Sequence, residues 1–355
     1  MSTMTLAERR GAPPPDQAMR PLVDRQRRHV EYLRLSVTDR CNLRCTYCIP
    51  EGGVQHLERA DVLSFEETVA LVRSFAQLGV RRLRLTGGEP TLRRELPALV
   101  SMLRAIDGIE DLALSTNGLR LVELAAPLRA AGVDRLNISV DSLQPDRFAR
   151  ITRGGDLGRV LTGIETARAV GFRAIKLNAV AVRGFNDDEL AAICGYAWER
   201  GLIPRFIEQM PMADGALFVP GTFLGAAEIR AIITASIPGA RLVAEHADGP
   251  ASGAGPARYW RLETEGAAAR RFGIISPLTE HFCDTCNRVR LSASGALHTC
   301  LGHDDATDLR AVLHAGGDAA VIDAIRAAVG AKRDGHQFGL LGIGGPRKTM
   351  VQIGG

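Results

Sequence analysis

The sequence predicts an α/β fold with a parallel sheet, followed by a smaller C-terminal module. Six short β-rich runs alternate with longer amphipathic segments as far as about residue 215, and several of these segments close on glycine. Beyond that point the alternation stops. Strands that alternate with helix-length segments form parallel sheets with helical crossovers. The pattern fits either an open doubly wound sheet or a barrel.

Each element has its own signal. The expected strands are LRLSV (33–37), RLRLT (82–86), DLALS (111–115), RLNISV (135–140), AIKLNAVAV (174–182) and RFIEQM (205–210). The first helix is expected over 64–79, because Ser64 and Glu67 form a capping box and Gly79 is a stop signal. The same amphipathic pattern predicts helices over 95–106, 121–132, 158–171 and 187–201.

The composition is that of a globular protein. The chain has 355 residues, 46% hydrophobic and 24% charged, with a net charge of +4 that is compatible with an anionic substrate but does not require one. No stretch approaches the roughly 18 apolar residues of a membrane span. Residues 1–28 lack a signal-peptide pattern and predict a disordered lead-in. We therefore expect a cytoplasmic protein whose seven cysteines are ligands or free thiols.

Three cysteines stand close together directly after the first expected strand. Cys41, Cys45 and Cys48 have the spacing C-x3-C-x2-C. One interpretation is a zinc knuckle with His56 as the fourth ligand. The other is an iron–sulfur cluster, which soft thiolates favour, with one iron left open to an exogenous ligand. A loop at the carboxyl end of a strand is where barrels build their active sites.

This spacing, with Tyr47 before the last cysteine, is identified as the signature of the radical S-adenosylmethionine superfamily. The resemblance implies a [4Fe–4S] cluster whose open iron chelates the amino and carboxylate groups of S-adenosylmethionine and cleaves it to a 5′-deoxyadenosyl radical. The stretch TGGEP (86–90) strengthens the resemblance. Gly87 and Gly88 let a ligand approach the backbone. Glu89 supplies a carboxylate for the methionyl ammonium group.

A second group of cysteines lies near the C-terminus. Cys283, Cys286 and Cys300 have the spacing C-x2-C-x13-C, and the spacing alone favours zinc completed by a nearby histidine, namely His281, His298 or His303. The presence of two triads in one chain shifts the interpretation to a second iron–sulfur cluster. The remaining Cys194 is expected in the core. Arg288 and Arg290 are either a solvated pair or, as guanidinium groups beside this cluster, a site for an anionic substrate.

Both triads, the stretch NRVRL (287–291) and the terminal IGG together resemble the GTP 3′,8-cyclase family, from about residue 29 to the end. The resemblance implies radical cyclisation of GTP to (8S)-3′,8-cyclo-7,8-dihydroguanosine 5′-triphosphate, the first step of molybdenum cofactor biosynthesis. The implied fold is an incomplete (β/α)6 TIM-type barrel with a C-terminal auxiliary-cluster module. The expected divisions are 1–28 lead-in, 29–215 barrel, 216–345 module and 346–355 Gly-Gly tail.

The resemblance also assigns residues. The metal ligands of two [4Fe–4S] clusters are Cys41, Cys45, Cys48, Cys283, Cys286 and Cys300. The S-adenosylmethionine contacts are Tyr47, Gly88, Glu89, Ser139 and Met210. The GTP contacts are Arg34, Arg84, Ser115 (where the family pattern has threonine), Lys176, Arg288, Val289 and Arg290. The catalytic assignments are Arg288, Arg290, Gly354 and Gly355, with the two glycines in a tail that reaches the active site.

The implied partners are GTP, an electron donor protein and a downstream cyclic pyranopterin monophosphate synthase, without nucleic acid or membrane, and a homodimer is compatible. Two alternatives stay open. One is a radical S-adenosylmethionine peptide maturase, which usually has more C-terminal cysteines than the three present here. The other is a non-catalytic zinc or electron-carrier protein, which has no use for TGGEP or for functional residues at six strand ends.

Overall fold

A curved, predominantly parallel sheet forms the centre of the molecule. The computed structural model describes residues 21–245 and 255–354. The first six strands pair in chain order, each parallel to the next. They are β1 (Tyr32–Ser36), β2 (Arg82–Thr86), β3 (Asp111–Thr116), β4 (Arg135–Ser139), β5 (Ala174–Ala181) and β6 (Ile203–Glu208). This arrangement confirms the partial barrel expected from the sequence.

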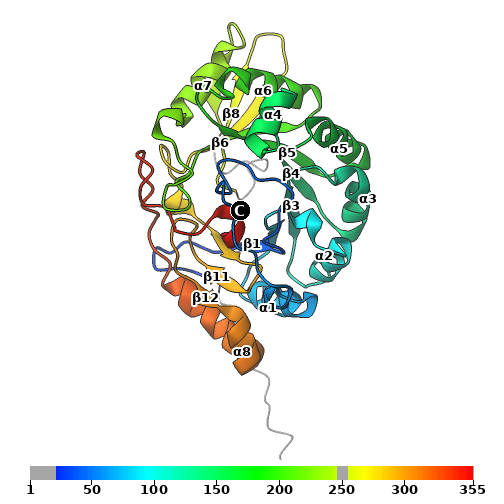
Figure 1. Ribbon diagram of the computed structural model, residues 1–355, viewed down its shortest axis with the longest axis vertical. Helices are drawn as coiled ribbons and strands as arrows, with labels where there is room; N and C mark the ends of the chain where they lie inside the picture. Colours follow the sequence, from blue (N-terminus) through cyan, green and yellow to red (C-terminus); the bar gives the residue numbers. More distant parts are fainter. Residues whose placement is uncertain (1–20, 246–254, 355) are drawn as a thin grey trace, which may run out of the picture.

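Helices cover the outer face of the sheet (Figure 1). They are α1 (Phe65–Gln77), α2 (Leu96–Arg104), α3 (Leu121–Ala131), α4 (Pro145–Thr152), α5 (Leu157–Val170), α6 (Leu190–Glu199), α7 (Ala226–Ala235) and α8 (Leu309–Gly330). The short α9 (Met350–Ile353) lies instead on the inner side of the curved sheet. The capping box of Ser64 and Glu67 is present at α1, and Gly79 follows that helix with φ +92°. The expected helices thus form, while α4, α7, α8 and α9 were not anticipated.

The C-terminal half extends the same sheet at both edges. Its strands are β7 (Arg241–Ala244), β8 (Arg258–Glu263), β9 (Arg270–Ile275), β10 (Arg288–Leu291), β11 (Ala296–His298) and β12 (Thr307–Asp308). β9 pairs parallel to β6 and β10 pairs parallel to β1, so eight parallel strands stand side by side. The antiparallel β8–β7 and β11–β12 complete the two edges. Strands of the expected C-terminal module (216–345) therefore contribute to the barrel wall.

Two hydrophobic clusters stabilise the fold. The larger lies between β1–β5 and helices α1–α5, and it includes residues of α8. The smaller lies between β5, β6, β8, β9, α6 and α7. Cys194 belongs to the smaller cluster, and burial raises the pKa of its thiol, which confirms the expected core position. None of the helices within 21–245 and 255–354 is long and apolar enough to cross a membrane.

The end of the expected lead-in is packed on the barrel. Residues 1–20 of that lead-in lie outside the described residues. Leu22 is buried and its N–H donates to the carbonyl of Leu78. Arg28 is also buried, and its guanidinium pairs with Asp24 at 2.5 Å and donates to the carbonyl of Cys283 at 2.7 Å. Residues 22–28 therefore differ from the disordered segment expected there, because these contacts hold them.

A buried carboxylate joins the barrel to the segment that leads to the second cysteine group. Glu208 ends β6, and its oxygens accept from the N–H groups of Ala226 at 2.9 Å, Leu278 at 2.9 Å and Thr279 at 3.1 Å. One side chain thus holds the start of α7 and the loop after β9.

Replacing Glu208 with Ala should destabilise the protein strongly. The buried N–H of Ala226 and the part-buried N–H groups of Leu278 and Thr279 lose their acceptor, and an unsatisfied buried donor costs about 1–3 kcal/mol. We expect the free energy of unfolding in urea to fall by about 2–3 kcal/mol. Glu228→Ala is the matched control, because that half-exposed carboxylate pairs with Arg183 at the surface and such pairs contribute about 0–1 kcal/mol. Equal stability of the two variants would contradict this role.

Candidate functional site

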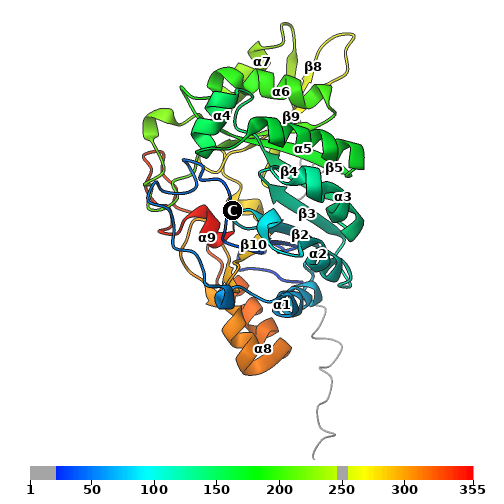
Figure 2. The same ribbon diagram turned by 45° about the vertical axis from the view of Figure 1, so that its right-hand side comes forward.

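One cavity lies inside the curved sheet, and both cysteine groups line it. Its volume is about 330 Å³, and much of its lining comes from the carboxyl ends of the strands and the loops that follow them. The N-terminal loops and the C-terminal segment lie on the same side of the sheet (Figure 2). The sequence-predicted residues in the lining are Arg34, Cys41, Cys45, Tyr47, Cys48, Arg84, Gly88, Glu89, Ser115, Ser139, Met210, Cys283, Cys286, Arg288, Arg290 and Cys300.

The first cysteine loop is fixed by its backbone. The N–H of Thr46 donates to the carbonyl of Ile151 in α4 at 2.9 Å, and the N–H of Cys48 donates to the carbonyl of Cys45 at 2.9 Å. Burial raises the pKa of the Cys41 thiol to about 11 and that of Cys48 to about 12. A bound metal centre would stabilise these half-buried thiols as thiolates.

The two glycines after β2 bring the cysteine loop against the sheet. A Cβ at Gly87 would lie 2.4 Å from the carbonyl oxygen of Thr38, and one at Gly88 would lie 2.4 Å from that of Arg40. The N–H of Gly88 donates to Thr38 and that of Glu89 donates to Arg40. The expectation was that these glycines admit a ligand. The structure shows that the missing side chains admit the backbone that leads to Cys41.

Glu89 is aimed by its neighbours. It is 1% exposed, and its Oε1 accepts from the Thr91 hydroxyl at 2.6 Å and the Thr116 hydroxyl at 2.7 Å. Its Oε2 accepts from the N–H of Asn117 at 2.7 Å. Burial raises the pKa of this carboxyl. Glu89 lines the cavity. Its Oε2 accepts only the one hydrogen bond from Asn117 among those named here, so it can accept another from an ammonium group.

Tyr47 contacts an aspartate that also lines the cavity and that the sequence did not single out. Its hydroxyl donates to Oδ2 of Asp141 at 2.7 Å, while Oδ1 accepts from the N–H of Val180 at 2.8 Å. Burial raises the pKa of Asp141 to about 6. Asp141 stands two residues after β4, and this position at a strand end is the signal that could have identified it.

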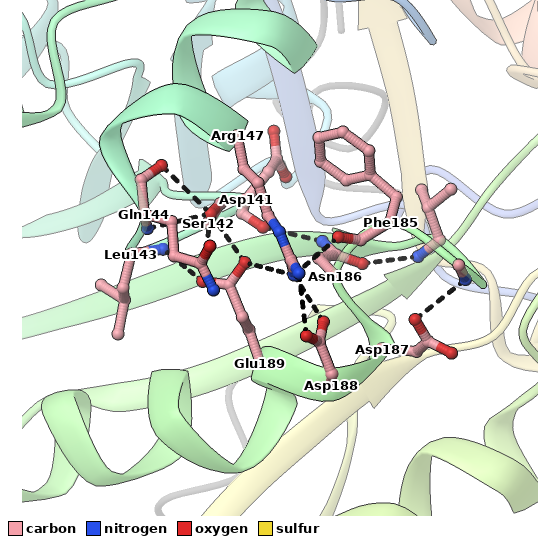
Figure 3. Close-up of polar contacts among 12 residues, drawn as sticks. Asp141, Ser142, Leu143, Gln144, Arg147, Phe185, Asn186, Asp187, Asp188 and Glu189 are labelled. Atoms are coloured by element: carbon pink, nitrogen blue, oxygen red, sulfur yellow. Dashed lines mark hydrogen bonds and ion pairs between the residues drawn. The ribbon is translucent and has the colours of Figure 1, made fainter.

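A buried polar network supports Asp141 from behind (Figure 3). The amide of Asn186 donates to the carbonyl of Asp141 at 2.7 Å. Glu189 accepts from the hydroxyl of Ser142 at 2.8 Å and from the guanidinium of Arg147 at 3.0 Å. The loops after β4 and β5 are therefore joined, and they hold Asp141 in place against the cysteine loop.

The second cysteine group lies in a crowded cradle. A Cβ at Gly335 would lie 3.1 Å from the sulfur of Cys283, so the chain passes close to this thiol. The N–H of Gly302 donates to the sulfur of Cys300 at 3.4 Å. Burial raises the pKa of the Cys286 thiol, but the cations Arg288 and Lys332 outweigh it and lower that pKa to about 7.

The donor sets fit iron–sulfur clusters. No three His, Cys, Asp or Glu side chains in the described part of the chain form a group that could hold a single metal ion. The six thiols instead border the common cavity, and cysteine thiolates are the usual ligands of such clusters. His56, the alternative zinc ligand, lies with Nδ1 3.2 Å from Asp39. The Nε2 of His303 lies 2.9 Å from the carbonyl oxygen of Gly335.

Arginines from adjacent strands form a cationic wall. Arg290, Arg34 and Arg84 are register partners on β10, β1 and β2. Burial, with Arg288 nearby, lowers the pKa of Arg290 to about 10, and burial with Arg290 and Arg84 lowers that of Arg34. The buried Nε of Arg84 has no hydrogen-bond partner within the described residues. This wall suits an anionic group of several charges.

A second, smaller cavity adjoins the first, and Arg84 and Arg205 line both cavities. Lys176 lies there rather than in the main cavity, and its Nζ donates to the hydroxyl of Tyr259 at 3.1 Å. Burial and Arg205 lower the pKa of Lys176 to about 8. Burial raises the pKa of Tyr259, but Arg205 and Lys176 outweigh it and lower that pKa to about 8.

Two further predicted residues have different surroundings. The side chain of Val289 lies in the hydrophobic core, on the face of β10 opposite Arg288 and Arg290, and does not line the cavity. Gly354 is buried with φ +84°, and its carbonyl accepts from the guanidinium of Arg290 at 2.7 Å. A Cβ there would lie 2.8 Å from the Cβ of Ser36. The remaining tail residue, Gly355, lies outside the described residues.

Sequence reasoning missed Arg205 and Tyr259. Arg205 lies within an expected strand, and its guanidinium donates to the side chains of Asn137 and Asn178. Arg205 is the first residue of the expected strand 205–210 but the third of six in β6, so the sequence prediction did not show it inside a buried strand. Tyr259 belongs to β8, which enters the region only through its pairing with β9, and no local pattern reveals that pairing.

Two family models match the chain. Residues 35–197 match the Radical SAM superfamily, and residues 203–338 match the family described as Molybdenum Cofactor Synthesis C. Among solved structures, Streptococcus suis SuiB bound to precursor peptide SuiA has a TM-score of 0.56 and 12% identity, covering 88% of this chain and 70% of that chain. This likeness shows the shared fold.

Curated relatives match along almost the whole chain. GTP 3′,8-cyclase of Rhodopseudomonas palustris (strain TIE-1) is 45% identical over 331 residues, which are 92% of this chain and 92% of the relative. GTP 3′,8-cyclase of Pelotomaculum thermopropionicum (strain DSM 13744 / JCM 10971 / SI) is 45% identical over 333 residues, 94% of this chain and 99% of the relative. The chain therefore belongs to the GTP 3′,8-cyclase family of the radical S-adenosylmethionine superfamily.

Proposed function

We propose that this protein cyclises GTP to (8S)-3′,8-cyclo-7,8-dihydroguanosine 5′-triphosphate as the first step of molybdenum cofactor biosynthesis. The observation that carries the proposal is one cavity bordered by two cysteine triads and a row of buried arginines. A radical generated beside one triad can thus meet an anionic nucleotide held beside the other. The names of the closely related proteins support GTP as that nucleotide.

The cysteine loop and its neighbours form the S-adenosylmethionine side of the site. When bound, a [4Fe–4S] cluster on Cys41, Cys45 and Cys48 supplies the electron that cleaves S-adenosylmethionine and so initiates hydrogen abstraction from ribose C3′. Oε2 of Glu89 accepts from the methionyl ammonium group, with Gly88, Ser139 and Met210 as the other contacts proposed there. The protein positions the reacting groups and keeps water away from them.

The opposite wall forms the GTP side of the site. The triphosphate pairs with Arg34, Arg84 and Arg205, while Lys176 lies below it and Ser115 contributes a hydroxyl. Arg290, at the β10 end of this wall, and Arg288, two residues after Cys286, direct the guanine base to the second cluster. Because the carbonyl of Gly354 accepts from Arg290, the tail fixes the orientation of that guanidinium. These contacts preorganise the nucleotide before the radical forms.

The proposal also assigns a cellular compartment, an electron donor and a downstream enzyme. The electron comes from a separate donor protein, and the product passes to a cyclic pyranopterin monophosphate synthase. The reaction takes place in the cytoplasm, and a homodimer is compatible with it. A peptide maturase, the rival activity, does not account for a wall of buried arginines suited to a triphosphate.

Deuterium at ribose C3′ of GTP tests the proposed chemistry directly. The protein is incubated without oxygen with S-adenosylmethionine, dithionite and the labelled GTP. We expect one deuterium in 5′-deoxyadenosine and a cyclised nucleotide that lacks it. Unlabelled GTP and labelled ATP are the controls. Unlabelled 5′-deoxyadenosine, or equal turnover of ATP, would refute the assignment.

The hydrogen-bonded pair of Lys176 and Tyr259 predicts a pH dependence of GTP binding. Each group has a pKa of about 8 beside the other, and the two share a hydrogen bond. The first proton to leave, from either group, takes the pair from a net charge of +1 to zero as the pH rises through about 8. Below pH 8 the charge is already present. Above it, GTP binding must restore a proton, and the affinity should fall by up to about tenfold per pH unit. Equilibrium binding of GTP between pH 7 and 9.5 measures this dependence.

The double variant Lys176→Arg, Tyr259→Phe provides the comparison. It keeps a cation but has neither titrating group, and its affinity should stay nearly constant over the same pH range. An equally steep loss of affinity in the double variant would assign the pH dependence to other groups.

A further inference from the structure

Lys332 is a buried cation beside the second cysteine group. It lies two residues after the end of α8 and is 2% exposed. Its Nζ donates to the carbonyl of Arg288 at 3.2 Å and to the carbonyl of Thr299. Arg288 stands two residues after Cys286, and Thr299 directly precedes Cys300. One ammonium group therefore joins the two segments that carry these cysteines.

This ammonium group has no carboxylate partner among the described residues. The nearby Arg28 provides a contrast, because it also donates to the backbone of a cysteine segment, at Cys283, but its charge is neutralised by Asp24 at 2.5 Å. A buried charge without a counter-ion costs several kcal/mol. The carboxyl end of α8 supplies a negative dipole of only about half a charge. The remaining anionic groups at hand are the thiolates of the cysteine group.

The choice of lysine also indicates a specific role. The chain contains three lysines, Lys176, Lys332 and Lys348, among 44 basic residues, so arginine supplies nearly every cation. An ammonium group is a compact point charge with three donors, whereas a guanidinium is a planar fork. A compact ammonium group can donate to two carbonyls that converge on one point from separate segments, and it does so here.

We propose that Lys332 is a positioning residue and the counter-charge for the iron–sulfur group held by Cys283, Cys286 and Cys300. It holds the segments of Cys286 and Cys300 at a fixed separation, and its positive charge raises the reduction potential of that group. The inference rests on the proposed second cluster and concerns a residue outside the proposed substrate contacts. Net charge and hydrogen bonding are among the factors that set cluster potentials.

The sign of the effect follows from the charge. Reduction adds an electron to the group, and a nearby cation stabilises the reduced form more than the oxidised form. Removing the cation should therefore make the midpoint potential more negative. We expect the ratio of reduced to oxidised cluster at the parent midpoint to fall about tenfold, which corresponds to about 59 mV for a one-electron couple.

The test uses the full chain with Cys41, Cys45 and Cys48 replaced by Ser, so that only the second cluster remains. Lys332→Met, Lys332→Gln and Lys332→Arg are compared in this background by iron content and by redox titration followed by electron paramagnetic resonance. Arg333→Gln is the matched control. It removes a charge from the adjacent residue, whose side chain is half exposed and pairs with Asp305 at the surface.

The proposal predicts a more negative midpoint in the Met and Gln variants, and an unchanged midpoint in the Arg variant and in Arg333→Gln. A parent-like midpoint in both neutral variants with full iron would overturn it. If both neutral variants lose their iron while the Arg variant keeps it, the charge is required for assembly, as proposed. Loss of iron in all three would show that only the shape of lysine matters and would overturn the counter-charge. Absence of iron in the parent background would instead refute the second cluster itself.

Discussion

The structure depends on a buried excess of positive charge. Arg84, Arg205, Arg290, Lys176 and Lys332 are all at least nine-tenths buried, and none makes an ion pair among the described residues. Carbonyls, amides and a phenol satisfy some of their donors but do not neutralise them. Charges buried in this way destabilise a fold unless anions join them. The proposed triphosphate and the thiolate-bound clusters would supply these anions.

Loops at the carboxyl ends of the strands enclose these buried charges in one cavity. Gly88 gives the first cysteine loop its place on β2, and Tyr47 with Asp141 fixes the far side of that loop. Glu208 fixes the segment that leads to the second cysteine group. The C-terminal segment also borders the cavity, since Gly354 packs close to Ser36 and its carbonyl accepts from Arg290. Loops from distant parts of the sequence thus converge on one cavity.

Local patterns in the sequence were sufficient for the six parallel strands and for both cysteine groups, whereas the choice of a barrel over an open sheet came from the family resemblance. The capping box at Ser64 and the glycine after α1 are local signals, and the structure shows both. The edge pairing of β9 and β10 was not predictable in this way, because parallel pairing between distant segments leaves no periodic trace. The depth of Lys176 was missed for a related reason, since its surroundings come from Tyr259 on β8. No local pattern marks Lys332 as buried, and only the tertiary fold reveals its burial.

The central claim is that the two cysteine groups serve one reaction with separable roles. It is tested by replacing Cys41, Cys45 and Cys48 with Ser in one variant, and Cys283, Cys286 and Cys300 with Ser in another. Iron, 5′-deoxyadenosine and cyclised nucleotide are then measured without oxygen. The first variant should form no 5′-deoxyadenosine. The second should lose about half the iron and all cyclisation, while some S-adenosylmethionine cleavage survives, because each triad holds one of two equal clusters. Cyclisation of GTP at the parent rate by the second variant would contradict the account.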